Sequence, residues 1–509
     1  MAYFVQYPVV EGADLGSGSR SRRCLALQKA WLKGALSLGW TRFVATFSTF
    51  IDCFQGLEKA VQDFSKAWKT SATLGLLLLA GCATPAEKAE QRTLREVAEH
   101  YRPQGVKPVL PQLTTNAPLR DFLTFALLNH PDVEAAYFDW VAAVARITSA
   151  GAPPDPALTF LMDIQSVVTS LMPGLMFTFP GPGKLRAQAN LAAAESAGKY
   201  HTFEARVLTA AFDVKKAYYE LYFLTGKIAV NCATLAVLGD IETVAQQRNV
   251  VNQATLQDVL RAQMEQERLR TEIANLEDSR QPLIAQFKAA LGLPADAPAP
   301  PLPARFETTP LSVAPSNLLA AAYAHNPRLK VMAAEVQRAE AALQLAAKAG
   351  VPDFSAGLET DLKMTPLLFR PQGSVTLPIW RSKIRAQLAD AQAQKSAAQA
   401  RLTNEQLALA VELAEKSYML READRNLTLT QDALLPKARL ALEAARAGYL
   451  SNQSSFVDLA DAWRTALAAE LDTLMARTTR ELALAELELL VLGQPPVGVA
   501  LLPRMENEK

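Results

Sequence analysis

The stretch VLTAAFDVKKAYYELYFLTGKIAVNCATLAVL, residues 207–238, decides the fold. Apolar residues recur in it every seven positions, and a second column lies three positions later. The columns are Val207, Val214, Leu221, Ile228 and Leu235, then Ala210, Ala217, Leu224, Asn231 and Leu238. This repeat predicts a long helix that packs its a and d positions against other helices, as in a coiled coil.

The chain contains this helix twice. A second leucine column, Leu413, Leu420, Leu427 and Leu434, follows the first at a constant distance of 199 residues. The same distance separates two basic segments, KLRAQ at 184–188 and KIRAQ at 383–387. We therefore expect a duplicated unit whose long helices begin near residues 184 and 383.

Each unit is predicted to run helix, strand hairpin, long helix, turn, returning helix. Proline suits the first helical turn and breaks what precedes it, so after His130-Pro131 a helix is expected from Asp132 to about Ala150, and after Asn326-Pro327 another to about Ala349. The returning helices, about 255–291 and 455–492, end at glycine. Pro436 predicts a kink or break in the second long helix.

The predicted strands alternate apolar with small or polar residues, at 158–164, 175–179, 354–361 and 374–380. The tips of the strand hairpins, at about 165–173 and 363–371, are expected to be short. Alternation over about ten residues is typical of a transmembrane barrel, although an ordinary amphipathic hairpin has the same pattern.

A short apolar run, 74–79, follows two lysines and ends in Leu79-Ala80-Gly81-Cys82. Such a run suits an export signal and is too short to span a membrane. Its end resembles a bacterial lipobox, which implies cleavage before Cys82 and acylation of that cysteine; Ala83 then implies the outer membrane. A short buried helix ending at a chance cysteine is the alternative.

Composition argues against several functions. The 52 basic and 51 acidic residues balance, so no nucleic-acid partner is indicated. The four histidines and four cysteines have neither metal-ligand nor disulfide spacing. Because no nucleophile–base pair or phosphate loop occurs either, we predict no enzyme, cofactor or metal site.

The duplicated order behind a lipobox resembles the TolC-like outer-membrane efflux proteins, in their lipoprotein branch. The likeness covers about 117–493 and includes the turn before Val457-Asp458-Leu459-Ala460-Asp461-Ala462. It implies a mainly α protein with a small β part. Three protomers, with four strands each, would build one transmembrane β-barrel in outer-membrane lipid, continuous with an α-helical barrel in the periplasm. A periplasmic membrane-fusion adaptor and an inner-membrane RND-type or ABC-type transporter would be partners.

The expected organisation follows from these boundaries. It comprises a non-native or unstructured N-terminal extension (1–60), a lipoprotein signal peptide (61–81), an acylated N-terminus with an extended linker (82–116), a first repeat (117–293), a linker (294–315), a second repeat (316–493) and a disordered tail (494–509). The alternative for residues 1–60 is a genuine extension without an assigned task.

Asp458 and Asp461 are the candidate periplasmic gate. Three residues apart on a helix, they share a face, and the resemblance implies a ring of six carboxylates in the trimer. Such a ring attracts cations. A simpler alternative is that acids in a first turn favour the helix dipole. Asp258 is a weaker candidate in the first unit, because Arg261 stands where its second acid would be.

The predicted function is a passive export duct that carries small molecules, such as drugs or metal ions, out of a Gram-negative cell. A type I secretion component is one alternative. A periplasmic coiled-coil lipoprotein scaffold without a pore is another, and the strand hairpins argue against it because a scaffold does not need them.

Overall fold

The computed structural model describes residues 84–164, 168–252, 254–302, 306–308, 317–363, 366–451 and 453–496. The predictions for residues 1–60, for the signal peptide, for Cys82 and for most of the tail fall outside these residues. The first described element is helix α3 (Pro85–Tyr101).

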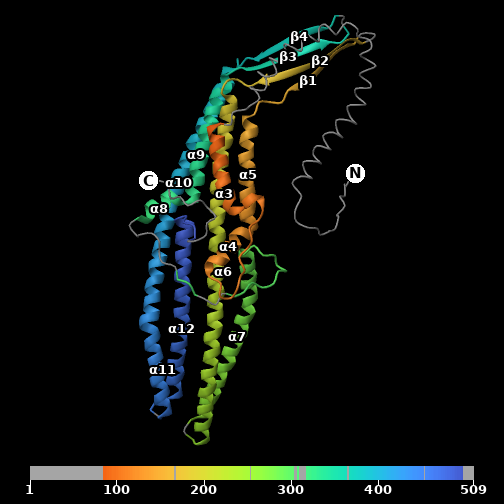
Figure 1. The fold of residues 1–509 in the computed structure, drawn as a ribbon. Helices are drawn as coiled ribbons and strands as arrows, with labels where there is room; N and C mark the ends of the chain where they lie inside the picture. The colour runs from red at the N-terminus through yellow and green to blue at the C-terminus, as the bar shows by residue number, and fades with distance from the viewer. Residues whose placement is uncertain are drawn as a thin grey trace, which may run out of the picture. The chain divides into compact units, whose positions relative to one another are not determined.

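The duplicated order is confirmed (Figure 1). The first repeat consists of α4 (Leu119–Asn129), α5 (Pro131–Gly151), β1 (Ala157–Ile164), β2 (Val168–Phe179), α6 (Lys184–Val250) and α7 (Leu256–Ala290). The second consists of α8 (Leu318–His325), α9 (Pro327–Ala347), β3 (Asp353–Asp361), β4 (Leu368–Thr376), α10 (Arg381–Thr428), α11 (Leu435–Leu450) and α12 (Phe456–Ala485). Short η turns are η1 (Pro103–Gly105), η3 (Lys348–Gly350), η4 (Leu429–Leu434) and η5 (Glu486–Val491). The mainly helical class with a small sheet is therefore confirmed.

Helix α6 is the centre of the packing, since it contacts α5, α7, α9 and α12. Every residue of its predicted seam is buried except Leu235, which is half-buried. Aromatic side chains extend this core, and Tyr218 and Tyr219 are fully buried. One stretch of α6 is apolar enough to cross a membrane by composition, but its helix neighbours identify it as a core helix.

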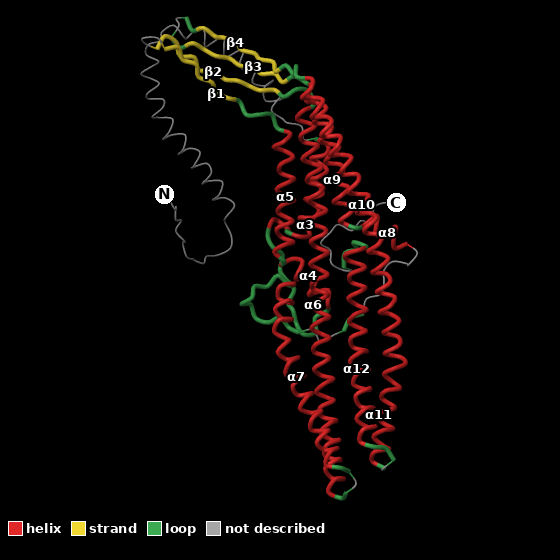
Figure 2. Tube along the Cα trace, turned by 180° about the vertical axis from the view of Figure 1, so that it is seen from behind, coloured by secondary structure: helices red, strands yellow, loops and turns green. Residues whose placement is uncertain are grey.

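The four strands form one antiparallel sheet in the order β1-β2-β3-β4 (Figure 2). Leu158 lies opposite Leu175, which lies opposite Leu358, so these residues share one face. That face exposes large apolar side chains, namely Leu158, Phe160, Met162, Leu175, Phe177, Phe179, Phe354, Leu358, Phe369 and Val375. The other face carries Asp163, Ser170, Glu359, Asp361 and Arg370, together with Leu161 and Leu368.

The tips of the strand hairpins are shorter than expected. Strand β2 begins at Val168 and β4 at Leu368, inside the segments predicted as tips, and β4 ends at Thr376 rather than at residue 380. Alternation alone misplaced these ends because the polar and small residues of β4 continue the pairing with β3 through backbone hydrogen bonds.

The expected extended linker after residue 82 is wrong for its first part, which forms helix α3. Thr84 caps the helix, and Pro85 begins it. Val97 and Tyr101 are buried against the first repeat. The segment looks polar in the sequence because only this narrow stripe packs.

The second repeat contains two wide π-helical turns, η4 and η5. Residue spacing accounts for both. From Lys184 to the α7 cap Thr255 is 71 residues, whereas from Lys383 to the α12 cap Ser455 is 72. From these caps to Gly292 and Gly493 the distances are 37 and 38 residues. A π-turn accommodates one additional residue in a helix, so each longer segment has one such turn.

Pro436 explains the first of them and confirms the expected break. In a regular helix the ring of Pro436 would clash with the carbonyl of Asp432, and proline has no N–H to donate. The π-turn η4 interrupts the regular α-helical hydrogen bonds just before this proline. The wide turn also rotates the seam. Leu434, expected to be buried, is 44% exposed, and Ala438 is buried instead.

Candidate functional site

The candidate aspartates lie beside two turns, one joining α6 to α7 and the other joining α11 to α12 (Figure 1). We call these turns the helix tips. Thr255 precedes α7 and Ser455 precedes α12, and both begin a reciprocal capping box. The amide of Asp458 donates to the Ser455 hydroxyl at 3.2 Å, and the Ser455 amide donates to Oδ2 of Asp458 at 2.9 Å.

Asp258 makes the same pair of bonds with Thr255, at 3.3 and 3.1 Å. The structure thus brings Asp258 and Asp458 to equivalent capping positions. The simpler alternative, that an acid is present because it favours a helix start, accounts for both of them; it does not account for Asp461.

Asp461 lies one turn into α12 and is 71% exposed. Its nearest cation is Arg464, with 3.6 Å between Nη1 and Oδ1. Arg464 also pairs with Glu265 of α7 and therefore ties the two repeats together near the helix tips. Asp458 is exposed as well, so the first turns of α12 present two carboxylates to solvent on one side.

Hydrogen bonds from the backbone amide and the hydroxyl of Ser455 hold the pKa of Asp458 below its usual range. Its carboxylate is therefore charged throughout the physiological pH range. The same bonds fix its position, because a carboxylate that accepts from its own cap cannot rotate freely.

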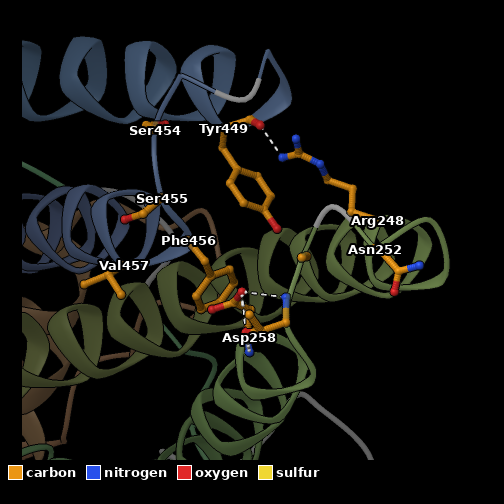
Figure 3. A pocket seen from close by; sticks show the side chains of 10 residues that line it. Arg248, Asn252, Asp258, Tyr449, Ser454, Ser455, Phe456 and Val457 are labelled. Carbon is orange, nitrogen blue, oxygen red and sulfur yellow. Dashed lines mark hydrogen bonds between the residues drawn. The ribbon is translucent and has the colours of Figure 1, made fainter.

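Between the two helix tips lies a cavity of about 380 Å³. Its lining residues are Arg248, Asn252, Ala254, Thr255, Asp258, Tyr449, Ser454, Ser455, Phe456 and Val457 (Figure 3). They come from both repeats, and Asp258 is the one candidate aspartate among them. The cavity thus lies between the α6–α7 pair and the α11–α12 pair.

A clasp formed by Arg248 and Tyr449 crosses this boundary (Figure 3). Nη1 of Arg248 donates to the Tyr449 carbonyl, and the guanidinium lies 4.6 Å from the centre of the Tyr449 ring. Phe456 packs edge-on against the same ring at 6.1 Å. Burial raises the pKa of Tyr449, although the Arg248 charge opposes this, and its hydroxyl finds no hydrogen-bond partner among the described residues.

Sequence reasoning missed the clasp. Arg248 and Tyr449 stand at non-equivalent places in the two repeats, so neither duplication nor a motif relates them. Among the described residues no group of three or more His, Cys, Asp or Glu side chains could hold a metal ion.

Comparison with known proteins adds independent findings. The model of the outer membrane efflux protein family matches residues 123–293 and 318–493. A membrane protein from Pseudomonas aeruginosa has a similar structure, with 20% identity, a TM-score of 0.65 and coverage of 75% of this chain and 93% of that one. The outer membrane protein VceC from Vibrio cholerae is 18% identical, with a TM-score of 0.61 and coverage of 73% of this chain and 95% of that one. The open-state MtrE outer membrane channel of Neisseria gonorrhoeae is 17% identical, with a TM-score of 0.63 and coverage of 76% of this chain and 96% of that one.

No curated protein sequence matches the chain. The family match alone covers both repeats, and therefore most of the chain. Together with the duplicated order of helix, strand hairpin and long helix, the family match shows that the chain belongs to the outer membrane efflux protein family.

Proposed function

We propose that three copies of this efflux protein form one conduit through the outer membrane and the periplasm, gated at the helix tips. Membership in the family makes the chain an outer-membrane efflux channel rather than an enzyme. The trimer, the gate, the lipid anchor and the partners are what the proposal adds.

The two-faced sheet carries the proposal. One face exposes ten large apolar side chains, whereas the other holds the charged residues. Such a sheet suits a wall between lipid and a water-filled lumen. Among the described strands, β1 and β4 each lack a partner on their outer edge. Open edges are not tolerated in lipid, and closure of four strands from each of three chains removes them.

The helices support the same assembly. Helix α10 buries few of its residues within the chain, and it exposes Leu407, Val411 and Tyr418 to between 51 and 69%. The three recur on one side of the helix. A neighbouring protomer would cover this side. A scaffold without a pore would need neither the sheet nor this surface.

Helix α3 supports acylation of Cys82. Only Ala83 separates Cys82 from the cap Thr84. The carboxylate of Glu87 accepts from Thr148 at 2.6 Å, near the end of α5 that leads into β1. The helix therefore begins on the side of the sheet, where a lipid would enter the inner leaflet. Radiolabelled palmitate should enter the wild-type chain and not Cys82→Ser.

The gate consists, in this proposal, of Asp458 and Asp461 from each protomer. Their carboxylates would narrow the periplasmic mouth and favour cations. The clasp of Arg248 and Tyr449 would hold the closed state. Opening requires the α11–α12 pair to move away from α6 and α7, and the two wide turns of the second repeat make it the less regular pair.

The helix tips are also the proposed docking site of a periplasmic adaptor, which would join the conduit to an inner-membrane RND-type or ABC-type pump. Large apolar side chains are exposed there, namely Val250, Val251, Leu256, Leu450 and Val457. Small molecules such as drugs or metal ions are the proposed cargo, with the choice made by the pump.

Single-channel conductance in a planar bilayer tests the pore and the gate together. The wild-type trimer should show a small, cation-selective conductance. In Asp458→Ala/Asp461→Ala the conductance should rise and the cation selectivity should fall. A pore unchanged by the double substitution would place the constriction elsewhere, and a folded trimer without conductance would refute the conduit.

A further inference from the structure

We propose that Lys215 and Lys416 are positioning residues for the gate. They hold the additional residue of the second returning helix within η5, and this fixes the rotation of α12 and the direction of its aspartates. The step from helix rotation to gating rests on the proposed function; the step from the lysines to rotation does not.

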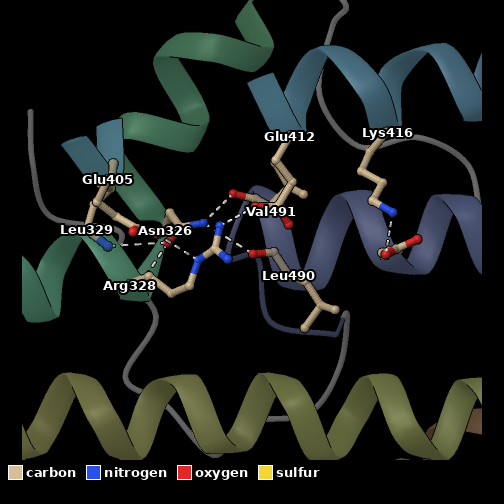
Figure 4. A network of polar contacts seen from close by, with 9 residues as sticks. Asn326, Arg328, Leu329, Glu405, Glu412, Lys416, Leu490 and Val491 are labelled. Atoms are coloured by element: carbon tan, nitrogen blue, oxygen red, sulfur yellow. Dashed lines mark hydrogen bonds and ion pairs between the residues drawn. The ribbon is translucent and has the colours of Figure 1, made fainter. Parts of the chain in front are cut away.

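The additional residue stays in the segment between Arg480 and Gly493 because other contacts fix both ends of this segment. At the C-terminal end, Nδ2 of Asn326 donates to the carbonyls of Leu490 and Val491 at 3.2 and 2.8 Å (Figure 4). Asn326 is fully buried, and Gly493 packs directly against it with a φ of +67°. This end of the helix therefore cannot slide.

On the other side, α12 is fixed to its neighbours by arginines. Nε of Arg480 lies 3.0 Å from Oδ1 of Asp424 on α10, and Arg477 donates to the Gln431 side chain in η4 at 2.8 Å. The segment between these contacts and Leu490 has one residue more than its counterpart in α7. It closes the surplus with a π-type bond, from the Leu492 amide to the Leu487 carbonyl at 2.8 Å.

The first repeat shows what happens without the surplus. Nδ2 of Asn129, which lies two residues before Pro131 where Asn326 directly precedes Pro327, donates to the carbonyls of Leu291 and Gly292 at 3.1 and 2.9 Å. Helix α7 stays α-helical to Ala290, even with Pro282 inside it. The shorter spacing of the first repeat thus fits a regular α-helix.

Two glutamates distinguish η5 from the equivalent part of α7. Counted back from the terminal glycines, Glu486 and Glu488 stand where the first repeat has Ala285 and Phe287. Nζ of Lys416, on α10, lies 2.8 Å from Oε1 of Glu486 (Figure 4). Helices α6 and α10 both contact η5, so lysines of the two repeats approach it from different helices.

Lys215, on α6, is the second of these lysines and is 6% exposed, and Glu488 is 7% exposed. Burial lowers the pKa of Lys215, and the charges of Glu488 and Glu481 raise it again. A buried cation is expensive unless carboxylates face it. The carboxylates that compensate Lys215 lie in both segments that the π-turn joins, Glu481 in α12 and Glu488 in η5, and η5 contacts α6.

The alternative register is a regular helix. If η5 became α-helical, its surplus residue would pass into α12, which would rotate by about 100° and shift by about 1.5 Å. Asp458 and Asp461 would then face a different neighbour, and Arg464 would leave Glu265. The lysines oppose this because rotation would withdraw both glutamates from them.

A thiol-crosslinking reporter measures the rotation directly. In a chain with Cys24, Cys53 and Cys232 changed to Ser, which leaves only the proposed lipid-bearing Cys82, Arg464→Cys/Glu265→Cys places one thiol on α12 and one on α7, and Lys227→Cys/Glu272→Cys places them on α6 and α7 as the matched control. Each pair replaces two long side chains that meet at their ends, so a bifunctional thiol reagent of about their combined length joins it. When Lys215→Met/Lys416→Met is added, the first crosslink should fall by at least about fivefold, because rotation carries the α12 thiol beyond the reach of the reagent. The control should stay unchanged.

Equal yields of both crosslinks in the lysine variant would overturn the proposal. If both crosslinks disappear because the variant does not fold, Lys416→Met alone decides, since the Lys416 and Glu486 side chains are partly exposed. The first crosslink should fall relative to the control in this single variant as well, whereas equal yields would overturn the proposal. The readout needs no conductance, so it separates this inference from the conduit itself.

Discussion

The clasp formed by Arg248 and Tyr449 predicts how strongly the substitution Arg248→Ala should favour opening of the helix tips. Arg248→Ala removes a charge-assisted hydrogen bond to the Tyr449 carbonyl and a cation over its ring at 4.6 Å. A hydrogen bond to a charged group contributes about 1.5–3 kcal/mol, and a cation–π contact about 0.5–2 kcal/mol. Because Arg248 is only half-buried, the lower ends apply, and their sum is about 2 kcal/mol per protomer.

This free energy stabilises the closed arrangement and is lost when the helix pairs separate. An energy of about 2 kcal/mol changes the ratio of closed to open helix tips by about thirtyfold. We therefore expect Arg248→Ala trimers in a planar bilayer to open more often, by about thirtyfold if one protomer's helix tips suffice to open the pore and by more if all three must move together. The cation selectivity set by Asp458 should remain.

Tyr449→Phe is the matched control. It keeps both the ring and the carbonyl that Arg248 contacts, and it removes only the hydroxyl, which makes no hydrogen bond of ordinary geometry among the described residues, although burial raises the pKa of Tyr449 and the nearby Arg248 opposes this rise. Its open fraction should therefore equal that of the wild type. If Arg248→Ala behaved like Tyr449→Phe, the clasp would have no part in closing the helix tips, and the reasoning from its geometry would be refuted.

Three further outcomes are expected. Ser455→Ala should raise the pKa of Asp458 partway toward its ordinary value, because the hydroxyl bond is lost while the bond from the backbone amide stays; a lowered pKa keeps the carboxylate charged as pH falls, so cation selectivity, measured as reversal potential, should be lost at a higher pH in the variant, and coincident pH curves would contradict this. Asn326→Ala should cost about 3 kcal/mol in guanidinium unfolding, and more than Asn129→Ala, because only Asn326 also caps a helix with its side chain; equal costs would argue against this double role. Gly292→Ala should cost at least about 2 kcal/mol in the same assay, since φ is +68° and the new Cβ would lie 2.8 Å from the Asn129 carbonyl oxygen; a neutral result would contradict the close packing.

Much of the fold is local in origin and could be predicted. The seven-residue columns of α6 are buried because a 3.6-residue helix repeats its face at that spacing. The proline starts and the capping box at Ser455 depend on neighbours within a few residues. The strand hairpins are visible as alternation for the same reason. Because the unit is duplicated, each of these sequence patterns occurs twice in the chain and supports the same prediction independently.

The missed features depend on residues far apart in the chain. Helix α3 is helical because Val97 and Tyr101 meet the first repeat, and the clasp joins residues of two repeats. The second leucine column predicts burial of Leu434, but η4 interrupts that column, so a correct periodicity gives a wrong face. Local patterns cannot report such contacts.

The returning helices separate the two kinds of information most clearly. Sequence by itself determined that the second is one residue longer, since the spacing from cap to glycine is 38 rather than 37 residues. Tertiary structure decided where that residue goes. A π-turn accommodates one additional residue wherever it forms in a helix, and tertiary contacts select η5: Asn326 and Arg480 fix the two ends of the segment, and Lys416 pairs with Glu486 inside it.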